Sequence, residues 1–223
     1  MNFLQGLDAS RLLLTLVPIL VCLTVHELAH GLAALALGDD TAKRMGRITL
    51  NPIRHIDPVG ALMIFFVGFG WAKPVMVDMN RFENPKVGMA ITALAGPMSN
   101  FLLAALILVF QVPLGLMFMD GIRISVEAGN LEWILAQTAQ ISVFLGVFNL
   151  LPIPPLDGSK IVFSFLRDRH YDLLMQYERY GFFLLVILIF WGGLTTGPLM
   201  TAMNTVLGSI FEVTRGLSVF LFG

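Results

Sequence analysis

The sequence has little of the charge that keeps a soluble protein in water. Charged residues make up 13% of its 223 positions and hydrophobic residues 57%, and its mean hydropathy is +0.81. Soluble domains carry about 25% charged and about 45–50% apolar residues. This composition excludes an ordinary soluble domain and predicts a chain that lies in a lipid bilayer.

Cysteine and excess basic charge are also scarce. Cys22 is the only cysteine, which excludes an internal disulfide and a CxxC zinc ribbon. The formal net charge is -1, whereas a nucleic-acid-binding protein carries a dominant basic footprint. We therefore expect no nucleic-acid partner.

Long hydrophobic runs are what the sequence has instead of charge. A helix needs about 20 apolar residues to cross a bilayer. Runs of that length occupy residues 12–37, 89–112 and 133–151, and residues 182–194 and 199–222 are expected to form one or two further spans. The run Val59–Trp71 is shorter, so we expect it to re-enter the membrane from one side instead of crossing it.

The stretch from Asp39 to Pro58 is polar. Residues of β type flank Gly46, and Asn51-Pro52 is a turn signal, so the stretch predicts a short β-hairpin. The predicted fold class is an all-α polytopic membrane protein of about five to six membrane segments. A small hairpin and re-entrant region is expected between the first two full spans.

Lysine and arginine are concentrated in two of the loops, and cytoplasmic loops of membrane proteins are enriched in these residues. Only Arg11 precedes the first span, and only Arg123 lies between the second and the third. We therefore place on the cytoplasmic side the loops that contain Lys43, Arg44, Arg47, Arg54, Lys73, Arg81 and Lys86, and Lys160, Arg167, Arg169 and Arg179.

Ionisable residues inside the first run indicate chemistry. His26, Glu27 and His30 form an H-E-x-x-H pattern, whose histidines lie one helical turn apart on one face and can bind one Zn²⁺. A carboxylate at the centre of a membrane helix costs on the order of 2.5–3.5 kcal/mol, so chance alone is a poor explanation for Glu27. The pattern predicts a metal site with Glu27 as the catalytic base.

A catalytic zinc ion takes three protein ligands and a water, so a third ligand is needed. His55 lies in the predicted hairpin and His170 in a charged cytoplasmic stretch. Asp157 is the better candidate, because the third span descends to the side of the membrane toward which the first span runs. Prolines that break the helix precede Asp157, and Gly158 follows it. The alternative role for Asp157 is an ordinary helix cap or turn residue.

Two further residues have both a metal-related and an ordinary interpretation. Cys22 lies one turn before His26 and could approach the metal, but we interpret it as a small buried hydrophobic residue. His55 could stabilise an oxyanion near the metal, but a loop histidine bonded to the backbone is the favoured interpretation.

Three motifs that occur in order resemble the site-2 protease family of intramembrane zinc metalloproteases. They are H-E-x-x-H at residues 26–30, G-x-x-x-N at residues 96–100 and N-x-x-P-x-x-x-x-D-G at residues 149–158. The intervening Asn51-Pro52, the run 55–58 and the run 70–74 resemble the compact prokaryotic branch, which lacks PDZ and CBS domains. The resemblance covers the core, residues 12–160.

The resemblance implies a set of site residues. One zinc ion per chain is held by His26, His30 and Asp157, Glu27 is the general base, and Asn149 helps to hold the substrate backbone. The implied partners are the lipid bilayer and a substrate protein with a transmembrane segment.

The resemblance also implies an organisation. Residues 1–223 are expected to form a single membrane-embedded protease domain, with its core at residues 12–160 and C-terminal membrane helices at residues 181–223. The expected location is the prokaryotic cytoplasmic (inner) membrane, with the active site nearer the cytoplasmic side.

A zinc transporter of the ZIP type is the main alternative, since such permeases also carry H-E-x-x-H in a membrane helix. A transporter predicts more intramembrane ligands and usually a histidine-rich loop, whereas His55 and His170 are the only other histidines. A catalytically inactive protein that kept the family fold is the second alternative.

Overall fold

The computed structural model describes residues 9–60, 72–111, 118–120, 123–125, 130–166, 180–181, 183–188 and 197–222. Its long helices are α1 (Ala9–Ala36), α4 (Pro85–Gln111), α5 (Asn130–Asn149) and α8 (Pro198–Phe222). The shorter elements are helices α2 (Thr41–Arg44) and α6 (Asp157–Ser164), 3-10 helices η1 (Pro52–His55) and η2 (Met79–Arg81), and strands β1 (Phe118–Asp120) and β2 (Arg123–Ser125), which pair antiparallel. The described chain is mainly helical, as its apolar runs predict.

Three of the helices coincide with the predicted full spans. Residues 14–36 of α1, 85–110 of α4 and 131–149 of α5 are long and apolar enough to cross a membrane. Lipid offers no hydrogen bonds to the backbone, so an apolar run of this length forms a helix, in which every central N–H and C=O is paired. The structure therefore confirms that the spans predicted at residues 12–37, 89–112 and 133–151 correspond to helices long and apolar enough to cross a membrane.

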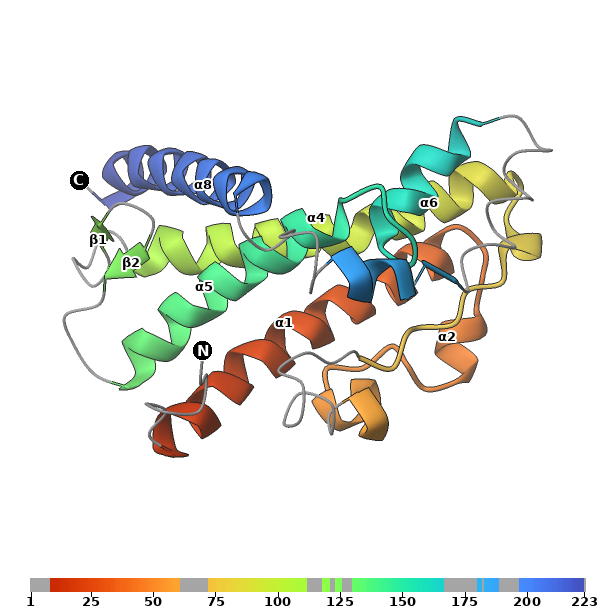
Figure 1. Cartoon of the computed structure of the whole chain (residues 1–223), viewed down its shortest axis with the longest axis horizontal. Coiled ribbons are helices and arrows are strands. Elements are labelled where there is room, and N and C mark those ends of the chain that lie inside the picture. Colours follow the sequence, from red (N-terminus) through yellow and green to blue (C-terminus); the bar gives the residue numbers. More distant parts are fainter. Residues whose placement is uncertain are drawn as a thin grey trace.

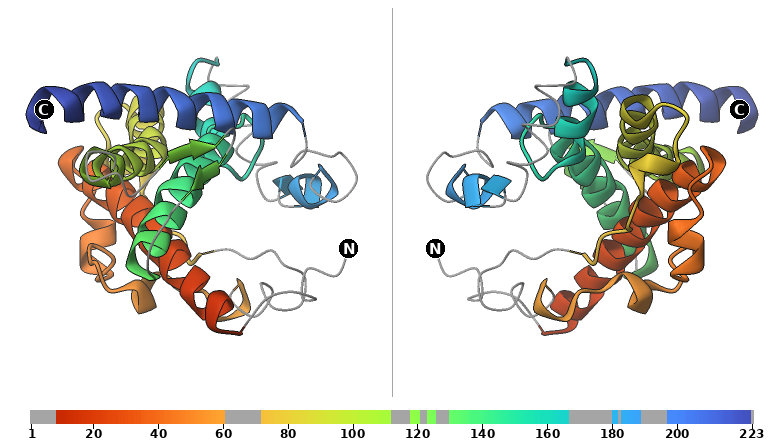
Figure 2. Two further views of the ribbon diagram at one scale, coloured as in Figure 1. Left: turned by 90° about the vertical axis from the view of Figure 1, so that its left-hand side faces the viewer. Right: turned by 90° about the vertical axis from the view of Figure 1, so that its right-hand side faces the viewer.

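The central helix is α4, because it contacts α1, α5, α6 and α8. In Figures 1 and 2, α8 runs across α4 and α5 on the side away from α1. A buried hydrophobic cluster fills the space between α4, α5 and α8, and it includes Leu108, Val143, Leu207 and Phe211. The packing of α1 against α4 and α5 leaves room for polar side chains, which form the site described below.

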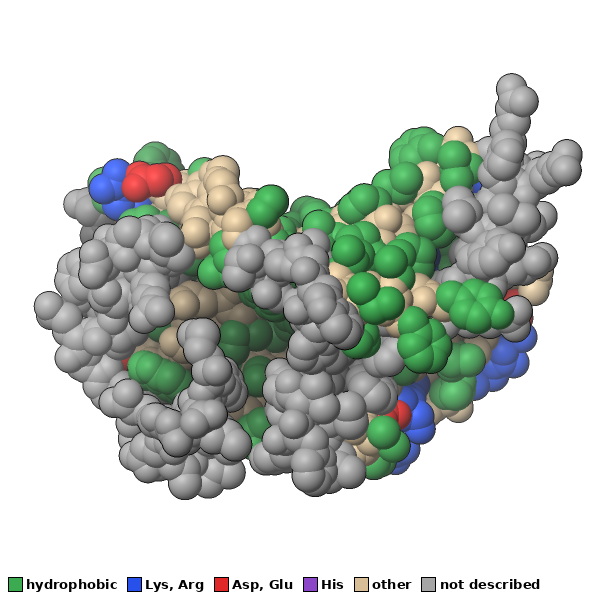
Figure 3. Space-filling model, viewed as in Figure 1, with side chains coloured by type: hydrophobic (Ala, Val, Ile, Leu, Met, Phe, Trp, Pro, Cys, Tyr) green, Lys and Arg blue, Asp and Glu red, His purple; other side chains and the backbone are tan. Residues whose placement is uncertain are grey.

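The surface is consistent with a chain that lies in a membrane. Hydrophobic side chains cover much of the described surface in Figure 3, whereas lysine and arginine side chains gather at the lower right, near α2. Leu102, Leu106 and Phe110 are large hydrophobic residues of α4 that the rest of the described chain leaves exposed. Such side chains suit contact with lipid tails.

The hairpin predicted for residues 39–58 is not formed. These residues form α2, η1 and turns, and their one strand-like contact is a single antiparallel bridge between Ile56 and Ala72. The Asp39 carboxylate accepts a hydrogen bond from the Thr41 N–H, 2.9 Å away, at the start of α2. Short polar side chains of this kind compete with strand pairing by bonding to nearby backbone, which a prediction from β-type residues and turn signals does not take into account.

The described residues include only parts of the remaining predicted segments. The run Val59–Trp71, predicted to be re-entrant, lies outside the described residues except at its first positions. Residues 182–194 are described only at 183–188, which are helical, and α8 covers the run 199–222 but is not among the helices apolar enough to cross a membrane. Membrane segments beyond the first three are therefore not confirmed.

Candidate metal centre

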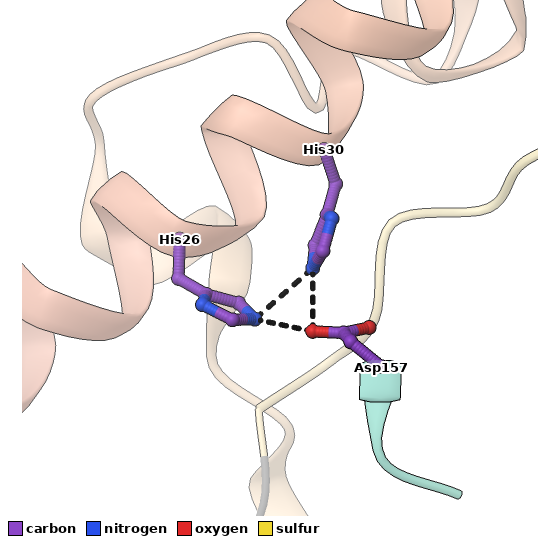
Figure 4. A group of neighbouring side chains, drawn as sticks. All are labelled: His26, His30 and Asp157. Atoms are coloured by element: carbon purple, nitrogen blue, oxygen red, sulfur yellow. Dashed lines mark hydrogen bonds and ion pairs between the residues drawn. The ribbon is translucent and has the colours of Figure 1, made fainter. Parts of the chain in front are cut away.

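The two histidines of α1 meet the first residue of α6 (Figure 4). His26 Nε2 lies 3.1 Å and His30 Nε2 lies 3.2 Å from Asp157 Oδ2. The two Nε2 atoms are themselves 3.0 Å apart. All three residues are buried, and within the described part of the chain they are the one group of histidine, cysteine and acidic residues that could hold a metal ion.

The partners of the outer ring nitrogens determine which atoms carry protons. His30 Nδ1 lies 2.7 Å from the Thr92 carbonyl oxygen, which can only accept, so Nδ1 donates and, in the neutral ring, Nε2 keeps a lone pair. His26 Nδ1 faces the Asn100 side-chain amide at 3.4 Å, and the Asn100 Oδ1 atom has no hydrogen-bond partner. Turning this amide over satisfies Oδ1 with the His26 Nδ1–H and leaves a lone pair on the Nε2 atom of His26 too.

Asp157 completes a set of electron-pair donors. As a carboxylate, Asp157 adds an Oδ2 lone pair that lies 3.1 and 3.2 Å from the two Nε2 atoms. Three lone pairs about 3 Å apart repel one another unless a cation lies among them. The arrangement therefore calls for a positive ion.

The geometry and chemistry of the three atoms fit zinc. Zn–N and Zn–O bonds of about 2.0–2.2 Å in a tetrahedral site place neighbouring ligand atoms about 3.3–3.6 Å apart. The three separations of 3.0, 3.1 and 3.2 Å are a few tenths of an ångström shorter. Two imidazoles and a carboxylate are also a ligand set of catalytic zinc sites, in which a fourth position stays open for water.

Asp157 reaches the histidines because the chain turns back sharply after α5. The prolines at positions 152, 154 and 155 end helical geometry, and α6 then begins at Asp157 itself. A Cβ atom at Gly158 would lie 2.1 Å from the Leu150 carbonyl oxygen, so only glycine fits where the chain doubles back. The carboxylate lies in the first turn of α6, where the positive end of the helix dipole favours it.

The G-x-x-x-N motif of α4 supports the histidines directly. A Cβ atom at Gly96 would lie 2.5 Å from His30 Nε2 and 2.6 Å from His26 Cε1. Asn100, one turn further along α4, faces His26. The sequence does not identify Asn100 and the Thr92 carbonyl as the hydrogen-bond partners of the histidines.

Glu27 lies beside the three residues and not among them. Its Oε2 atom accepts a hydrogen bond from the Val75 N–H at 2.8 Å. Glu27, Asn149 and the three residues of the cluster all line one cavity of about 340 Å³, together with Pro74–Val77, Met89, Thr92, Ala93, Pro155 and Lys160. The structure thus brings every predicted site residue to a single cavity.

The ordinary interpretations of Cys22 and His55 agree with their surroundings. Cys22 is fully buried, and its thiol donates to the Thr138 carbonyl oxygen at 3.4 Å, not toward the cluster. His55 is buried in η1 with Nε2 2.9 Å from the Thr49 carbonyl oxygen, which is a bond to backbone. His170 lies outside the described residues.

Known proteins resemble the chain over most of its length. The model of peptidase family M50 matches residues 14–191. A Bacillus subtilis protein named "Putative zinc metalloprotease YwhC" is 38% identical over 175 residues, which is 77% of this chain and 78% of that protein. A Mycolicibacterium smegmatis protein named "Putative zinc metalloprotease Rip2" is 28% identical over 179 residues, which is 76% of this chain and 64% of that protein.

A third relative is Rip2 of Mycobacterium tuberculosis, which is 31% identical over 173 residues, or 76% of this chain and 63% of that protein. The aligned region thus spans less than two thirds of either Rip2 protein but most of YwhC. No solved structure is a significant match to the chain.

Proposed function

Because the chain belongs to peptidase family M50, we propose that it is an intramembrane zinc metalloprotease that cleaves membrane-spanning or membrane-inserted segments of other proteins. The family and the similarity to YwhC support the zinc metalloprotease activity. The intramembrane reaction, the zinc ligands and the role of Glu27 are our proposal.

One observation carries the proposal of an intramembrane zinc metalloprotease. Three buried atoms with lone pairs, His26 Nε2, His30 Nε2 and Asp157 Oδ2, lie within 3.2 Å of one another beside a carboxylate, in one cavity bordered by apolar helices. A cation site next to a base that is not needed as a ligand is the arrangement that metal-assisted hydrolysis requires. We infer that His26, His30 and Asp157 hold one zinc ion.

Each remaining residue then has a defined role in the reaction. When bound, zinc lowers the pKa of its water toward 7 and polarises the substrate carbonyl. Glu27 accepts the proton of the attacking water and later delivers it to the leaving amine. Asn149 lines the same cavity, where its side chain can bond to the substrate backbone.

The apolar helices favour a substrate that is itself in the membrane. A helical substrate must unwind locally, because its carbonyls are otherwise occupied by intrahelical hydrogen bonds. We propose that residues 1–223 form one membrane-embedded protease domain in a prokaryotic cytoplasmic membrane. The cavity lies where the end of α1 meets α6, and the basic residues near these ends support a location toward the cytoplasmic side.

Purified protein and matched variants in detergent, incubated with a panel of single-span membrane proteins, test the proposal. Glu27→Gln keeps the size of the side chain but removes the base, so we expect full zinc content and a rate about 10²–10⁴ times lower. Asp157→Ala should lose zinc as well as activity. Glu83→Gln, at an exposed position, is the control and should behave as wild type.

Full cleavage by Glu27→Gln would contradict the proposed mechanism. A different result would favour a transporter instead. In that case neither the wild type nor any variant cleaves a substrate, and zinc flux into liposomes depends on His26 and His30.

A further inference from the structure

An extended segment, residues 72–78, lies along the catalytic cavity. Pro74, Val75, Met76 and Val77 line the cavity. Both ends of the segment are attached to other elements by their backbone. The Lys73 N–H donates to the His55 carbonyl oxygen at 2.8 Å, and the Asp78 N–H donates to Asp39 Oδ2 at 2.7 Å. Hydrogen bonds at Lys73 and at Asp78 therefore hold the middle of the segment in place from both ends.

The middle of the segment contacts the base. The Val75 N–H donates to Glu27 Oε2 at 2.8 Å, and Glu27 is 9% exposed. Within the described part of the chain, the Glu27 carboxylate accepts no other hydrogen bond. The helix backbone of α1 sets the place of the Glu27 Cα atom, but it does not set the direction of a side chain with three rotatable bonds.

We propose that the backbone N–H of Val75 is a positioning group for Glu27, and that segment 72–78 is the support that holds this N–H in place. This inference rests on the proposed protease function. A hydrogen bond to a charged acceptor is short and strong, and it selects one rotamer of the carboxylate before the substrate arrives. A misplacement of about 1 Å in such a group can reduce a rate about 100-fold.

An ester in place of one amide tests the contact without altering a side chain. Incorporation of 2-hydroxy-3-methylbutanoic acid at position 75 by nonsense suppression replaces the N–H with an oxygen and keeps the valine side chain. The control is an ester at Leu50, made with 2-hydroxy-4-methylpentanoic acid, because Leu50 is exposed, does not line the cavity, and its N–H has no hydrogen-bond partner in the described structure.

The expected result is a fall in kcat of about 10- to 100-fold for the ester at position 75, with KM and bound zinc unchanged. The ester at position 50 should have the kcat of the wild type. A position-75 ester as active as the control would overturn the proposal. A more active one would also overturn it, since the N–H would then restrain Glu27 and not position it.

A second measurement does not depend on cleavage. In protein labelled with ¹⁵N-valine, the Val75 amide proton should resonate further upfield and exchange faster with solvent in Glu27→Ala, but not in the control Glu83→Ala. An unaltered Val75 amide would show that the contact is absent and the proposal wrong. A normal contact in a wild-type protein that cleaves no substrate would instead overturn the protease function, and the positioning role with it.

Discussion

At the scale of single residues, Asn100 is the partner that sets the proton on His26. Its fully buried side chain faces His26 Nδ1, so Asn100→Leu removes the group that keeps a proton on Nδ1 and a lone pair on Nε2. Loss of such a partner of a metal-binding histidine typically lowers metal affinity 10- to 100-fold. We expect Asn100→Leu to weaken zinc binding by about this factor, as measured by competition with a chelator of known affinity.

Asn149→Leu is the matched control for this change. Asn149 lines the same cavity, but its amide donates to the Leu145 carbonyl oxygen and not to a histidine. Zinc affinity should therefore be retained, while cleavage should fall if Asn149 holds the substrate backbone. Equal zinc affinities for the Asn100 and Asn149 variants would show that Asn100 does not orient His26.

At the scale of elements, Asp39 joins the end of α1 to the segment that contacts Glu27. Its fully buried carboxylate accepts hydrogen bonds from the Thr41 N–H, the Thr41 hydroxyl and the Asp78 N–H, and Arg81 Nε lies 3.8 Å away. Asp39→Asn replaces one acceptor oxygen with a donor, so we expect a loss of about 1–3 kcal/mol of stability at neutral pH, measured by thermal or denaturant unfolding in detergent.

The pKa of Asp39 predicts how this loss depends on pH. Burial raises that pKa, but the hydrogen bonds and Arg81 outweigh burial and lower it below its usual value. A carboxyl whose pKa is lower in the folded state contributes stability above its unfolded pKa, about 3.9, and loses that contribution as the pH falls through the folded pKa. The stability difference between wild type and Asp39→Asn should therefore shrink below about pH 4.

Asp40→Asn serves as the control at the neighbouring position. The Asp40 side chain is 44% exposed and pairs with Arg44 and Arg81, and exposed ion pairs contribute about 0–1 kcal/mol. Its replacement should change stability little at any pH. A pH-independent difference for Asp39→Asn would mean that its charge does not hold the segment.

At the scale of the whole molecule, the spans and the cluster could be predicted because both depend on strong local signals. Hydropathy summed over a span outweighs any one residue, and His26 and His30 share a face by helix geometry alone. Asp157 lies 131 residues from His26 in the sequence, yet the orientation of the spans brings them together. The Val75 contact could not be predicted, because it uses a backbone N–H that every residue except proline has.

The orientation of the molecule in its membrane gives the last prediction. α2 and the β1–β2 pair lie at opposite ends of the molecule in Figure 1. If the basic loops are cytoplasmic, a cysteine at Met45, an exposed position just after α2, should react with a membrane-impermeant maleimide in inverted vesicles. A cysteine at Ser125 in β2 should react in vesicles of the opposite orientation.

The native chain suits this labelling experiment, because its single cysteine, Cys22, is fully buried and should contribute little background. The substitution at Met45 removes no charge, so it leaves the signal that sets orientation intact. Reaction of the two cysteines from the same side would contradict a single crossing of the membrane, by α4, between them. If instead the cysteine at position 125 reacted in inverted vesicles and the cysteine at position 45 in the others, Asp157 and the proposed zinc site would lie away from the cytoplasm. The basic loops would then not determine the orientation.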